Sequence, residues 1–429
     1  LAMRARFSCT VPQRRIRPAL LRVAAVITLA VTSIAFMPVW PASADNPVRA
    51  ARNVILLIGD GMGSAQVETC RRAAALAGRR LAMDSMPVTS LVITTSAGGE
   101  ITDSAAAATA MATGRKTVNG RLGIGPDGEY LPNITESVRA TGGLIGLVTN
   151  CSITSATPAG FVVHIPDRDS GRDIARAMVE AGPDVALGGG AAFFMPTLFE
   201  RARPALDSAL EKGYTVVMEL DELEAAFTLP LLGLFAMTDM PYELDRDLAE
   251  EPSLRQMTQK ALALLAKSSG DAGFFLMVEG GRIDHACHAM DSNRLIAEVA
   301  SLDDAVSAAL EFARRRGDTL VVVTADHETG QLEVTNDGRI VFGHDGHTEA
   351  LVPLFAEGPG QEWFSIGVLD NTDIARLIAR ALCPPGAVSG RGPATRDRPG
   401  RRPSTPGDRM PSPHRRSSSP CEHRFRLRT

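Results

Sequence analysis

Three runs of consecutive apolar residues, far apart in the chain, constrain the fold more strongly than any other feature of the sequence. They occur within residues 53–63 (NVILLIGDGMG), 274–281 (FFLMVEGG) and 319–327 (TLVVVTADH). Continuous aliphatic and β-branched runs of this length are typical of strands buried on both faces, as in a parallel sheet covered by helices. Helical patterns alternate with them, for instance at residues 257–266 and 295–315. We therefore predict an α/β fold with a doubly wound, mainly parallel central sheet flanked by helices.

Each apolar run stops at an acidic residue: the first at Asp60, the second at Glu279 and the third at Asp326, which His327 follows. In doubly wound sheets, ligands bind beyond the carboxyl ends of the strands. One such acid could be a helix cap or a satisfied turn residue. Three acids at the same edge of a sheet favour a shared binding site.

A pair of metal-ligand residues follows Glu279. Asp284 and His288 are four residues apart, so a helix would place both side chains on one face. A solvated helix face has the same spacing, but the position directly after a strand-terminal acid favours ligation. Histidines at His344 and His347 add further donors. Carboxylates and neutral imidazoles are the ligands expected for zinc and magnesium.

Ser104 is the candidate nucleophile. It precedes the alanine-rich segment AAAATAMATG, a strong helix former, so Ser104 is predicted at or near a helix N-terminus. Its ordinary role there would be to cap the helix. The functional alternative is a hydroxyl whose ionised form is favoured by the helix dipole and an adjacent metal ion.

The two ends of the chain differ in composition from the middle. Residues 1–44 are predicted to be a signal peptide: Arg14, Arg15, Arg17 and Arg22 precede an uncharged run at residues 23–36, and small residues at 42–44 offer a cleavage site. A retained N-terminal anchor is the alternative. After cleavage no membrane span is expected. Residues 384–429 are rich in Pro, Arg and Ser and poor in apolar residues, which predicts a disordered tail.

The intervening residues 45–383 hold 28 basic and 46 acidic residues, a net charge of −18. This balance argues against nucleic-acid binding, which depends on basic side chains. The same segment contains Cys70, Cys151, Cys287 and Cys383. Export would permit disulfides between them, and buried free thiols are the alternative.

Several short motifs occur in a characteristic order along the chain. They are Asp60-Gly61-Met62-Gly63, Asp103-Ser104-Ala105, Thr113-Gly114 with Lys116-Thr117 and Asn119-Gly120, Ala156-Thr157-Pro158-Ala159, Glu279-Gly280-Gly281-Arg282-Ile283-Asp284-His285, Thr324-Ala325-Asp326-His327 and Gly346-His347-Thr348. In this order they resemble the motifs of the alkaline phosphatases. The resemblance runs from about residue 52 to 382 and identifies residues 45–383 as an alkaline phosphatase-like catalytic domain.

The resemblance implies a set of site residues. It implies that a first zinc ion is bound by Asp284, His288 and His347, and a second by Asp60, Asp326 and His327 together with Ser104. It implies that a magnesium ion is bound by Asp60, Thr157 and Glu279. Arg168 falls where the family has its phosphate-clamping arginine, and His285 would hydrogen-bond toward the phosphate or tune the metal.

The implied activity is phosphate monoester hydrolysis through a phosphoserine at Ser104, with two zinc ions and one magnesium ion as cofactors. Small phosphate monoesters are the expected substrates, the expected location is secreted or periplasmic, and a homodimer is expected by analogy with relatives. Alternatives are a phosphodiesterase or other ester hydrolase on the same scaffold, and a non-catalytic metal- or phosphate-binding protein.

Two positions depart from the family pattern. Two residues before Thr157 the family commonly has Asp or His, whereas this chain has Ser155. This difference predicts a weakened or rearranged magnesium shell. Residues 348–351 after His347 lack the small and acidic residues often found there in the family, and His344, three residues before His347, is the rival zinc ligand. Residues 352–355 fit the family and favour His347.

Overall fold

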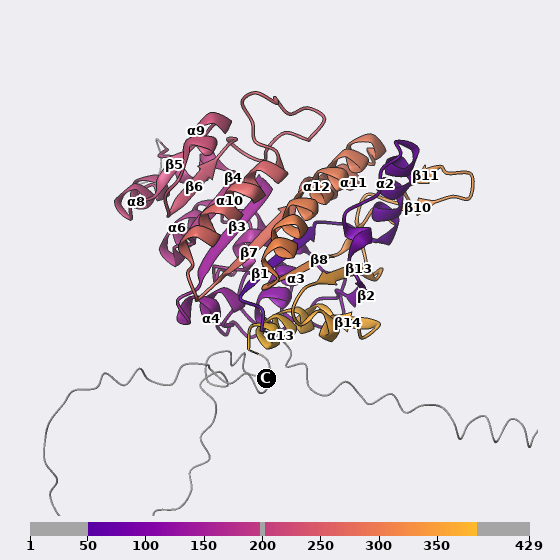
Figure 1. The fold of residues 1–429 in the computed structure, drawn as a ribbon, viewed down its shortest axis with the longest axis horizontal. Coiled ribbons are helices and arrows are strands. Elements are labelled where there is room, and N and C mark those ends of the chain that lie inside the picture. Colours follow the sequence, from indigo (N-terminus) through magenta and orange to yellow (C-terminus); the bar gives the residue numbers. More distant parts are fainter. Residues whose placement is uncertain (1–49, 198–201, 384–429) are drawn as a thin grey trace, which may run out of the picture. The chain divides into compact units, whose positions relative to one another are not determined.

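A ten-stranded sheet forms the centre of the computed structural model, which describes residues 50–197 and 202–383 (Figure 1). In spatial order the strands are β14 (Val368–Asp370), β2 (Val88–Ile93), β13 (Val352–Glu357), β8 (Thr319–Ala325), β1 (Asn53–Gly59), β7 (Phe274–Gly280), β3 (Leu144–Ser152), β4 (Val185–Gly189), β6 (Leu231–Leu234) and β5 (Thr215–Val217). All neighbours are parallel except at β13, which runs antiparallel to β2 and β8. The predicted mainly parallel α/β fold is confirmed.

The three apolar runs form β8, β1 and β7, which lie side by side in the middle of the sheet. Every residue of these strands is buried, as expected for strands covered on both faces. Gly59 at the end of β1 pairs with Ala325 of β8 and with Gly280 of β7. This register places the acids that end the three runs at one edge of the sheet.

Helices cover both faces of the sheet. The α-helices are α2 (Ser64–Leu76), α3 (Ser104–Thr113), α4 (Ile134–Ala140), α5 (Ala156–Gly160), α6 (Gly171–Ala181), α7 (Ala191–Phe194), α8 (Ala205–Glu211), α9 (Leu220–Ala225), α10 (Leu254–Ser268), α11 (Arg282–His288), α12 (Ser292–Arg316) and α13 (Asn371–Leu382), with short 3-10 helices at Met83–Ser85 and Gln361–Phe364. Helices α10 and α12 pack together on one face, and α3, α5 and α13 pack on the other (Figure 1). Both helical patterns in the sequence are confirmed, since α10 and α12 contain them.

Helix α3 is buried along its whole length because its side chains are small. All ten residues are buried, and most are alanine. Its neighbour α5 approaches so closely that a Cβ atom at Gly160 would lie 2.8 Å from the Cβ of Ala108. This packing fixes the N-terminus of α3, and hence Ser104, relative to the sheet.

A two-stranded ladder extends the site beyond the main sheet. Strand β9 (Glu328–Thr329) directly follows the end of β8 and pairs antiparallel with β12 (His347–Thr348). Between them, β10 (Glu333–Val334) and β11 (Ile340–Val341) form a hairpin. The Gly330 amide donates a hydrogen bond to the Gly346 carbonyl at 2.9 Å, so the two ends of the segment that contains the hairpin lie next to each other. The ladder thus brings His347 beside the end of β8.

The predicted signal peptide, residues 1–44, and the predicted disordered tail, residues 384–429, lie outside the described residues. Within the described part of the chain, no helix combines the length and apolar character needed to cross a bilayer. Cys70, Cys151 and Cys287 are buried free thiols, which confirms that alternative for these three residues.

Candidate active site

Acidic side chains converge at the carboxyl ends of the central strands. Asp60 follows β1, Asp326 follows β8, and Glu279 is the penultimate residue of β7. All three are buried, with exposed fractions of 9%, 0% and 1%. The shared binding edge predicted from the sequence is therefore present in the fold.

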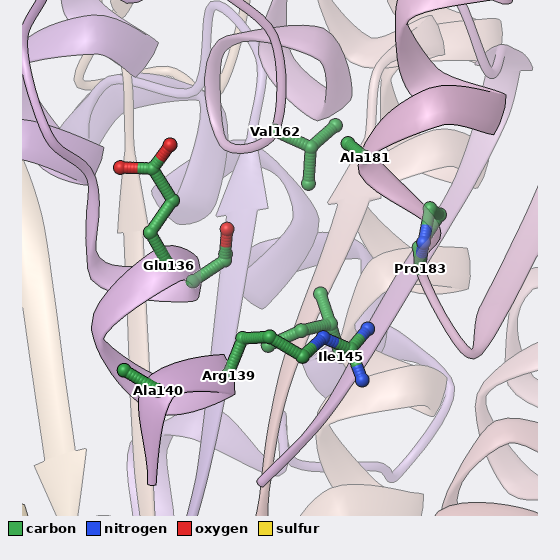
Figure 2. Close-up of a pocket in the computed structure, with 8 residues that line it drawn as sticks. Glu136, Arg139, Ala140, Ile145, Val162, Ala181 and Pro183 are labelled. Atoms are coloured by element: carbon green, nitrogen blue, oxygen red, sulfur yellow. The ribbon is translucent and has the colours of Figure 1, made fainter. Parts of the chain in front are cut away.

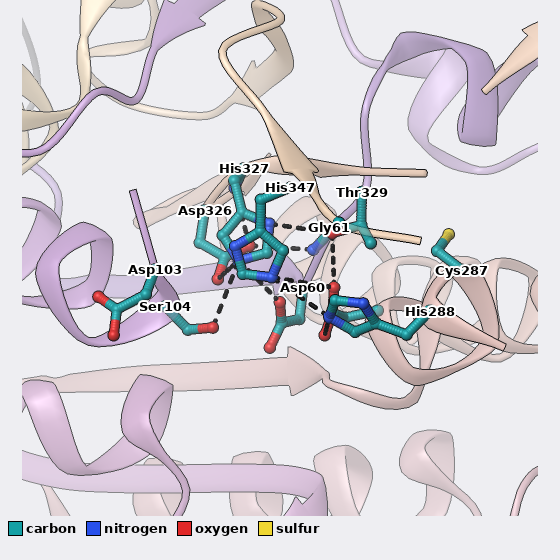
Figure 3. A network of polar contacts seen from close by, with 12 residues as sticks. Asp60, Gly61, Asp103, Ser104, Cys287, His288, Asp326, His327, Thr329 and His347 are labelled. Atoms are coloured by element: carbon teal, nitrogen blue, oxygen red, sulfur yellow. Dashed lines mark hydrogen bonds and ion pairs between the residues drawn. The ribbon is translucent and has the colours of Figure 1, made fainter. Parts of the chain in front are cut away.

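One cluster of potential metal ligands consists of Asp60, Asp326 and His327, whose donor atoms lie within 4.8 Å of one another. Asp326 Oδ1 accepts hydrogen bonds from the backbone amides of Gly61 (3.0 Å) and His327 (2.8 Å). Asp326 Oδ2 and Asp60 Oδ1 are buried but accept no hydrogen bond from any residue in the described part of the chain. These two oxygens lie 3.3 and 3.5 Å from His327 Nε2, so both face the same small volume (Figure 3).

A second cluster adjoins the first. Donor atoms of Asp284, His327 and His347 also lie within 4.8 Å of one another. The His288 side chain completes this group: its Nε2 lies 3.0 Å from Asp284 Oδ2 and 3.3 Å from His347 Nε2. The structure therefore brings together the six residues expected to hold the two zinc ions, namely Asp60, Asp284, His288, Asp326, His327 and His347.

The three histidines share one orientation. His347 Nδ1 lies 3.0 Å from the Thr102 carbonyl, and His288 Nδ1 contacts the Asp345 carbonyl. Both Nδ1 atoms must donate, because a carbonyl oxygen only accepts. His327 Nδ1 lies 3.2 Å from Thr329 Oγ1. The Thr329 hydroxyl already donates its hydrogen to Asp284 Oδ1 at 2.5 Å, so it can only accept from His327 Nδ1. The Nε2 lone pairs are consequently left for a cation, the usual arrangement of metal-bound histidines.

Gly61 allows the two clusters to approach. It has φ +68°, and a Cβ atom there would lie 2.8 Å from both Asp284 Oδ1 and Thr329 Oγ1. Any side chain would therefore displace a ligand carboxylate as well as strain the backbone.

Glu279 and Thr157 are two of the residues expected to bind magnesium. The Thr149 hydroxyl donates to Glu279 Oε2 at 2.5 Å, and the buried Thr157 Oγ1 has no hydrogen-bond partner among the described residues. Ser155 is the N-cap residue of α5, but its side chain makes no capping hydrogen bond. It offers no carboxylate or imidazole toward this site.

Ser104 is the first residue of α3, and its hydroxyl lies 3.3 Å from His327 Nε2. The predicted position of Ser104 at a helix N-terminus is confirmed, and of its two possible roles the structure contradicts capping: Asp103 is the N-cap residue and accepts from the Ala106 amide at 2.9 Å. Because the Asp103 carboxylate accepts the hydrogen bond from the free backbone amide, the Ser104 hydroxyl is not needed to cap the helix. Ser104 is thus buried at the ligand cluster with its hydroxyl turned to it (Figure 3).

Arg168 reaches the site through Asp103. Its Nη1 donates to Asp103 Oδ2 at 3.1 Å, and the Gly120 amide donates to the same oxygen at 2.9 Å. Although burial opposes it, the Asp103 charge raises the pKa of Arg168 further above its ordinary value. The permanently charged Arg168 guanidinium is therefore bound to Asp103, the residue that directly precedes Ser104.

Two other histidines lie apart from the clusters. His344 is exposed, and its Nδ1 accepts from the Gly346 amide at 2.9 Å. His285 Nδ1 lies 2.6 Å from Arg282 Nη1 and 3.9 Å from Asp239 Oδ2. The structure thus brings His347, and not His344, to the metal-ligand clusters.

Replacing His347 with alanine is expected to reduce the predicted phosphomonoester turnover by at least about 100-fold, because it removes a candidate ligand whose Nε2 lies 3.8 Å from Asp284 Oδ1. His344→Ala is the matched control and is expected to stay within about twofold of the wild type. Turnover and bound metal are measured for both variants. The reverse pattern would reassign the ligand to His344.

The charges of the site favour a bound cation. Burial, and then the charges of Asp326 and Asp284, raise the pKa of Asp60 well above its ordinary value. Burial raises the pKa of Glu279 to about 7. The hydrogen bond that His288 donates to the Asp284 carboxylate raises the pKa of His288 to about 9. Buried carboxylates packed this closely are costly without positive charge between them.

This electrostatic arrangement predicts a pH dependence for the metal-free protein. A raised folded-state pKa means that the folded protein binds more protons than the unfolded chain, so stability falls as pH rises. For His288 the loss runs from about pH 6.5 to about 9, and for Glu279 it ends near pH 7. We expect the Tm of the metal-free protein to fall by on the order of 5 °C between pH 6.5 and 9. The metal-loaded protein is the control and is expected to change less; an equal change would contradict the prediction.

Some residues of the site carry no signal in the sequence. Thr329 joins Asp284 to His327, and Thr149 supports Glu279. Asn150 accepts from the backbone amides of Gly281 and Arg282 at the start of α11. None of these belongs to a recognisable ligand pattern, since their roles depend on which strands lie next to each other.

A cavity of about 430 Å³ lies elsewhere, beside α4 and the start of β3 (Figure 2). Its two charged residues are already paired: Glu136 contacts His164 and Tyr130, and Arg139 pairs with Asp184. The cavity contains none of the predicted site residues.

Comparison with known proteins gives a consistent result. The family model of alkaline phosphatase matches residues 51–344. The streptomycin-6-phosphate phosphatase of Streptomyces griseus is 34% identical, over 77% of this chain and 90% of the relative. The alkaline phosphatase of Escherichia coli is 33% identical, over 77% of this chain and 86% of the relative. A variant of the alkaline phosphatase from the Antarctic bacterium TAB5, solved with Mg bound, is 31% identical with a TM-score of 0.72, over 78% of this chain and 99% of that one.

Proposed function

The chain belongs to the alkaline phosphatase family and is a metal-dependent phosphomonoesterase, and we propose that it acts through a phosphoserine at Ser104 beside two zinc ions and one magnesium ion. The observation that carries the proposal is the position of the Ser104 hydroxyl, 3.3 Å from an imidazole shared by two ligand clusters. The Arg168 guanidinium is held next to it by Asp103.

The donor set fits the proposed cations. Asp60 Oδ1, Asp326 Oδ2 and Thr157 Oγ1 are buried polar atoms with no hydrogen-bond partner within residues 50–197 and 202–383, and a bound cation would satisfy them. We assign the first zinc to Asp284, His288 and His347, the second to Asp60, Asp326, His327 and Ser104, and the magnesium to Asp60, Thr157 and Glu279. When bound, these ions supply positive charge that favours an ionised serine hydroxyl and attracts the phosphate dianion to an acidic protein.

The side chains of the protein account for substrate orientation. The Arg168 fork donates two hydrogen bonds to non-bridging phosphate oxygens, while Asp103 prevents the fork from turning away. Ser104 Oγ attacks phosphorus, its bond to phosphorus forms as the ester P–O bond breaks, and the alcohol leaves with a proton. Water then cleaves the Ser104–phosphorus bond and releases inorganic phosphate. His285 is proposed to donate a hydrogen bond toward the phosphate.

The ends of the chain are assigned by composition. We propose that residues 1–44 direct export and are removed, that residues 45–383 form the catalytic domain, and that residues 384–429 are a tail outside it. The protein would then act in the periplasm or outside the cell. A homodimer remains a proposal made by analogy with relatives.

Comparing a phosphate monoester with its matched diester tests the proposed reaction. We expect kcat/KM for p-nitrophenyl phosphate to exceed that for bis(p-nitrophenyl) phosphate by at least about 100-fold, because Arg168 and the clusters would engage non-bridging oxygens that the diester replaces with an ester group. The purified metal-loaded enzyme is used for both substrates. A preference for the diester would support the phosphodiesterase alternative instead.

A further inference from the structure

Glu328 directly follows the proposed zinc ligand His327, and its carboxylate lies in a buried set of hydrogen bonds. Only 4% of the residue is exposed. Its Oε1 accepts from Gln66 Nε2 at 2.7 Å and from the Leu332 amide at 3.0 Å, and its Oε2 accepts from the Thr348 hydroxyl at 2.5 Å. Both oxygens of this carboxylate are therefore satisfied by donors of the protein.

Close packing fixes the position of Glu328. Gln66 on α2 is fully buried, and the same amide nitrogen that reaches Glu328 also donates to the Thr329 carbonyl at 2.7 Å. A Cβ atom at Gly63 would lie 2.3 Å from Glu328 Cγ, so the side chain passes directly over the backbone that precedes α2. The carboxylate consequently has little freedom to turn.

Thr348, which hydrogen-bonds Glu328, is the neighbour of His347 on β12. The ladder of β9 and β12 has only two residue pairs, with Thr348 opposite Glu328 and His347 opposite Thr329. Residues 343–345 and 349–351, on either side of β12, are largely exposed. Because a two-stranded ladder is marginally stable by itself, side-chain contacts decide how firmly such a short strand is held. The Thr348 hydroxyl anchors this strand to a buried acceptor.

We propose that Glu328 is a positioning residue, which holds Thr348 and thereby keeps His347 Nε2 facing Asp284 for the first zinc ion. The inference rests on the proposed function, in which His347 is a ligand of that ion. Among the described residues, Glu328 belongs to neither ligand cluster, so it acts only through β12. A ligand that is held in place beforehand loses less conformational freedom on binding, which strengthens the binding of the metal.

The test changes Thr348, because loss of the Glu328 carboxylate would also leave two other buried donors unpaired. Thr348→Val removes the hydroxyl and keeps the shape of the side chain, whereas Thr348→Ser retains the hydroxyl. Thr335→Val is the matched control. The Thr335 hydroxyl also donates to a carboxylate, that of Asp337, but in the exposed turn of the β10–β11 hairpin.

The zinc affinity of the full chain is measured by competition with a chelator of known affinity. We expect Thr348→Val to weaken the binding of one zinc ion about tenfold, the smaller of the usual effects of losing a supporting contact around a metal site. Thr348→Ser and Thr335→Val are expected to stay within about twofold of the wild type, as changes that leave the supporting contact in place.

Two further measurements separate a positioning role from a general loss of stability. At a chelator concentration that removes one ion from Thr348→Val, the ¹⁵N NMR spectrum of labelled histidine is expected to show His288 and His347 without metal, while His327 retains it. In a His347→Ala background, Thr348→Val is expected to have no additional effect on zinc affinity, because the contact acts through His347.

The proposal fails if Thr348→Val binds both zinc ions as tightly as Thr335→Val does, if Thr348→Ser is weakened as much as Thr348→Val, or if both ions are lost together. The wild type is measured in the same experiments. A wild type that binds no zinc would reject the proposed function, whereas a wild type with two zinc ions and an unchanged Thr348→Val variant would reject only the role of Glu328.

Discussion

Ser104→Ala is expected to lower phosphomonoester turnover by at least about 10³-fold and to remove the phosphoenzyme while leaving the fold intact. The loss is large because no other described hydroxyl hydrogen-bonds His327 Nε2, and because nucleophile removal in covalent catalysis has effects of this order or greater. The fold is expected to survive because Asp103, not Ser104, caps α3, and because alanine is a better helix former than serine.

The measurements are steady-state turnover and acid-quenched labelling with a ³²P-phosphate ester. Ser64→Ala is the matched control, since Ser64 is the first residue of α2 just as Ser104 is of α3, but it is exposed. The control is expected to retain turnover and labelling. A Ser104→Ala protein that turns over at more than a tenth of the wild-type rate would refute the covalent mechanism.

Removal of metal ions is expected to abolish turnover and to lower the Tm by at least about 10 °C. Both effects have one cause: without cations, the buried carboxylates Asp60, Glu279 and Asp326 face each other across an uncompensated gap. Ions bound well above their Kd each add several kcal/mol to the folded state, enough for a shift of this size. Zinc supplied together with magnesium is expected to restore both properties, and magnesium alone is not.

A single substitution is also expected to remove metal from the protein. Asp326→Asn removes the charge of a fully buried residue that we propose as a zinc ligand, and it is expected to lower the bound zinc by about one equivalent with no chelator present. Asp337→Asn, in the exposed turn of the β10–β11 hairpin, is the control and is expected to change neither metal content nor turnover. Metal is measured by mass spectrometry on protein of verified concentration. Full activity in protein shown to be metal-free would overturn the assignment of the cofactors.

The sequence predicted the strand ends of the site because apolar runs and acids are local features. Asp60, Glu279 and Asp326 follow from the rule that parallel strands present their carboxyl ends together, and the register of β8, β1 and β7 agrees with it. The helical spacing of Asp284 and His288 is equally local. These residues of the site could be predicted without knowing how the helices and strands pack.

Other features could not be predicted because they join distant parts of the chain. The Thr102 carbonyl that orients His347 is 245 positions away from it, and Asn150 is 131 positions from the Gly281 amide. Such contacts depend on how the helices and loops pack over the sheet, which no run or spacing records. The cap of α3 could not be chosen from the sequence for a simpler reason: Asp and Ser are both favoured at that position, and the pattern does not distinguish Asp103 from Ser104.

The hydrogen bond between Gly330 and Gly346 closes the segment that contains the β10–β11 hairpin, so the position of His347 does not depend on the length of that hairpin. Since the Gly330 amide bonds to the Gly346 carbonyl, residues added or removed at the tip would leave β9 and β12 in register. Lengthening a closed loop costs little free energy. The length of the hairpin can therefore change without moving His347 relative to the carboxyl end of β8.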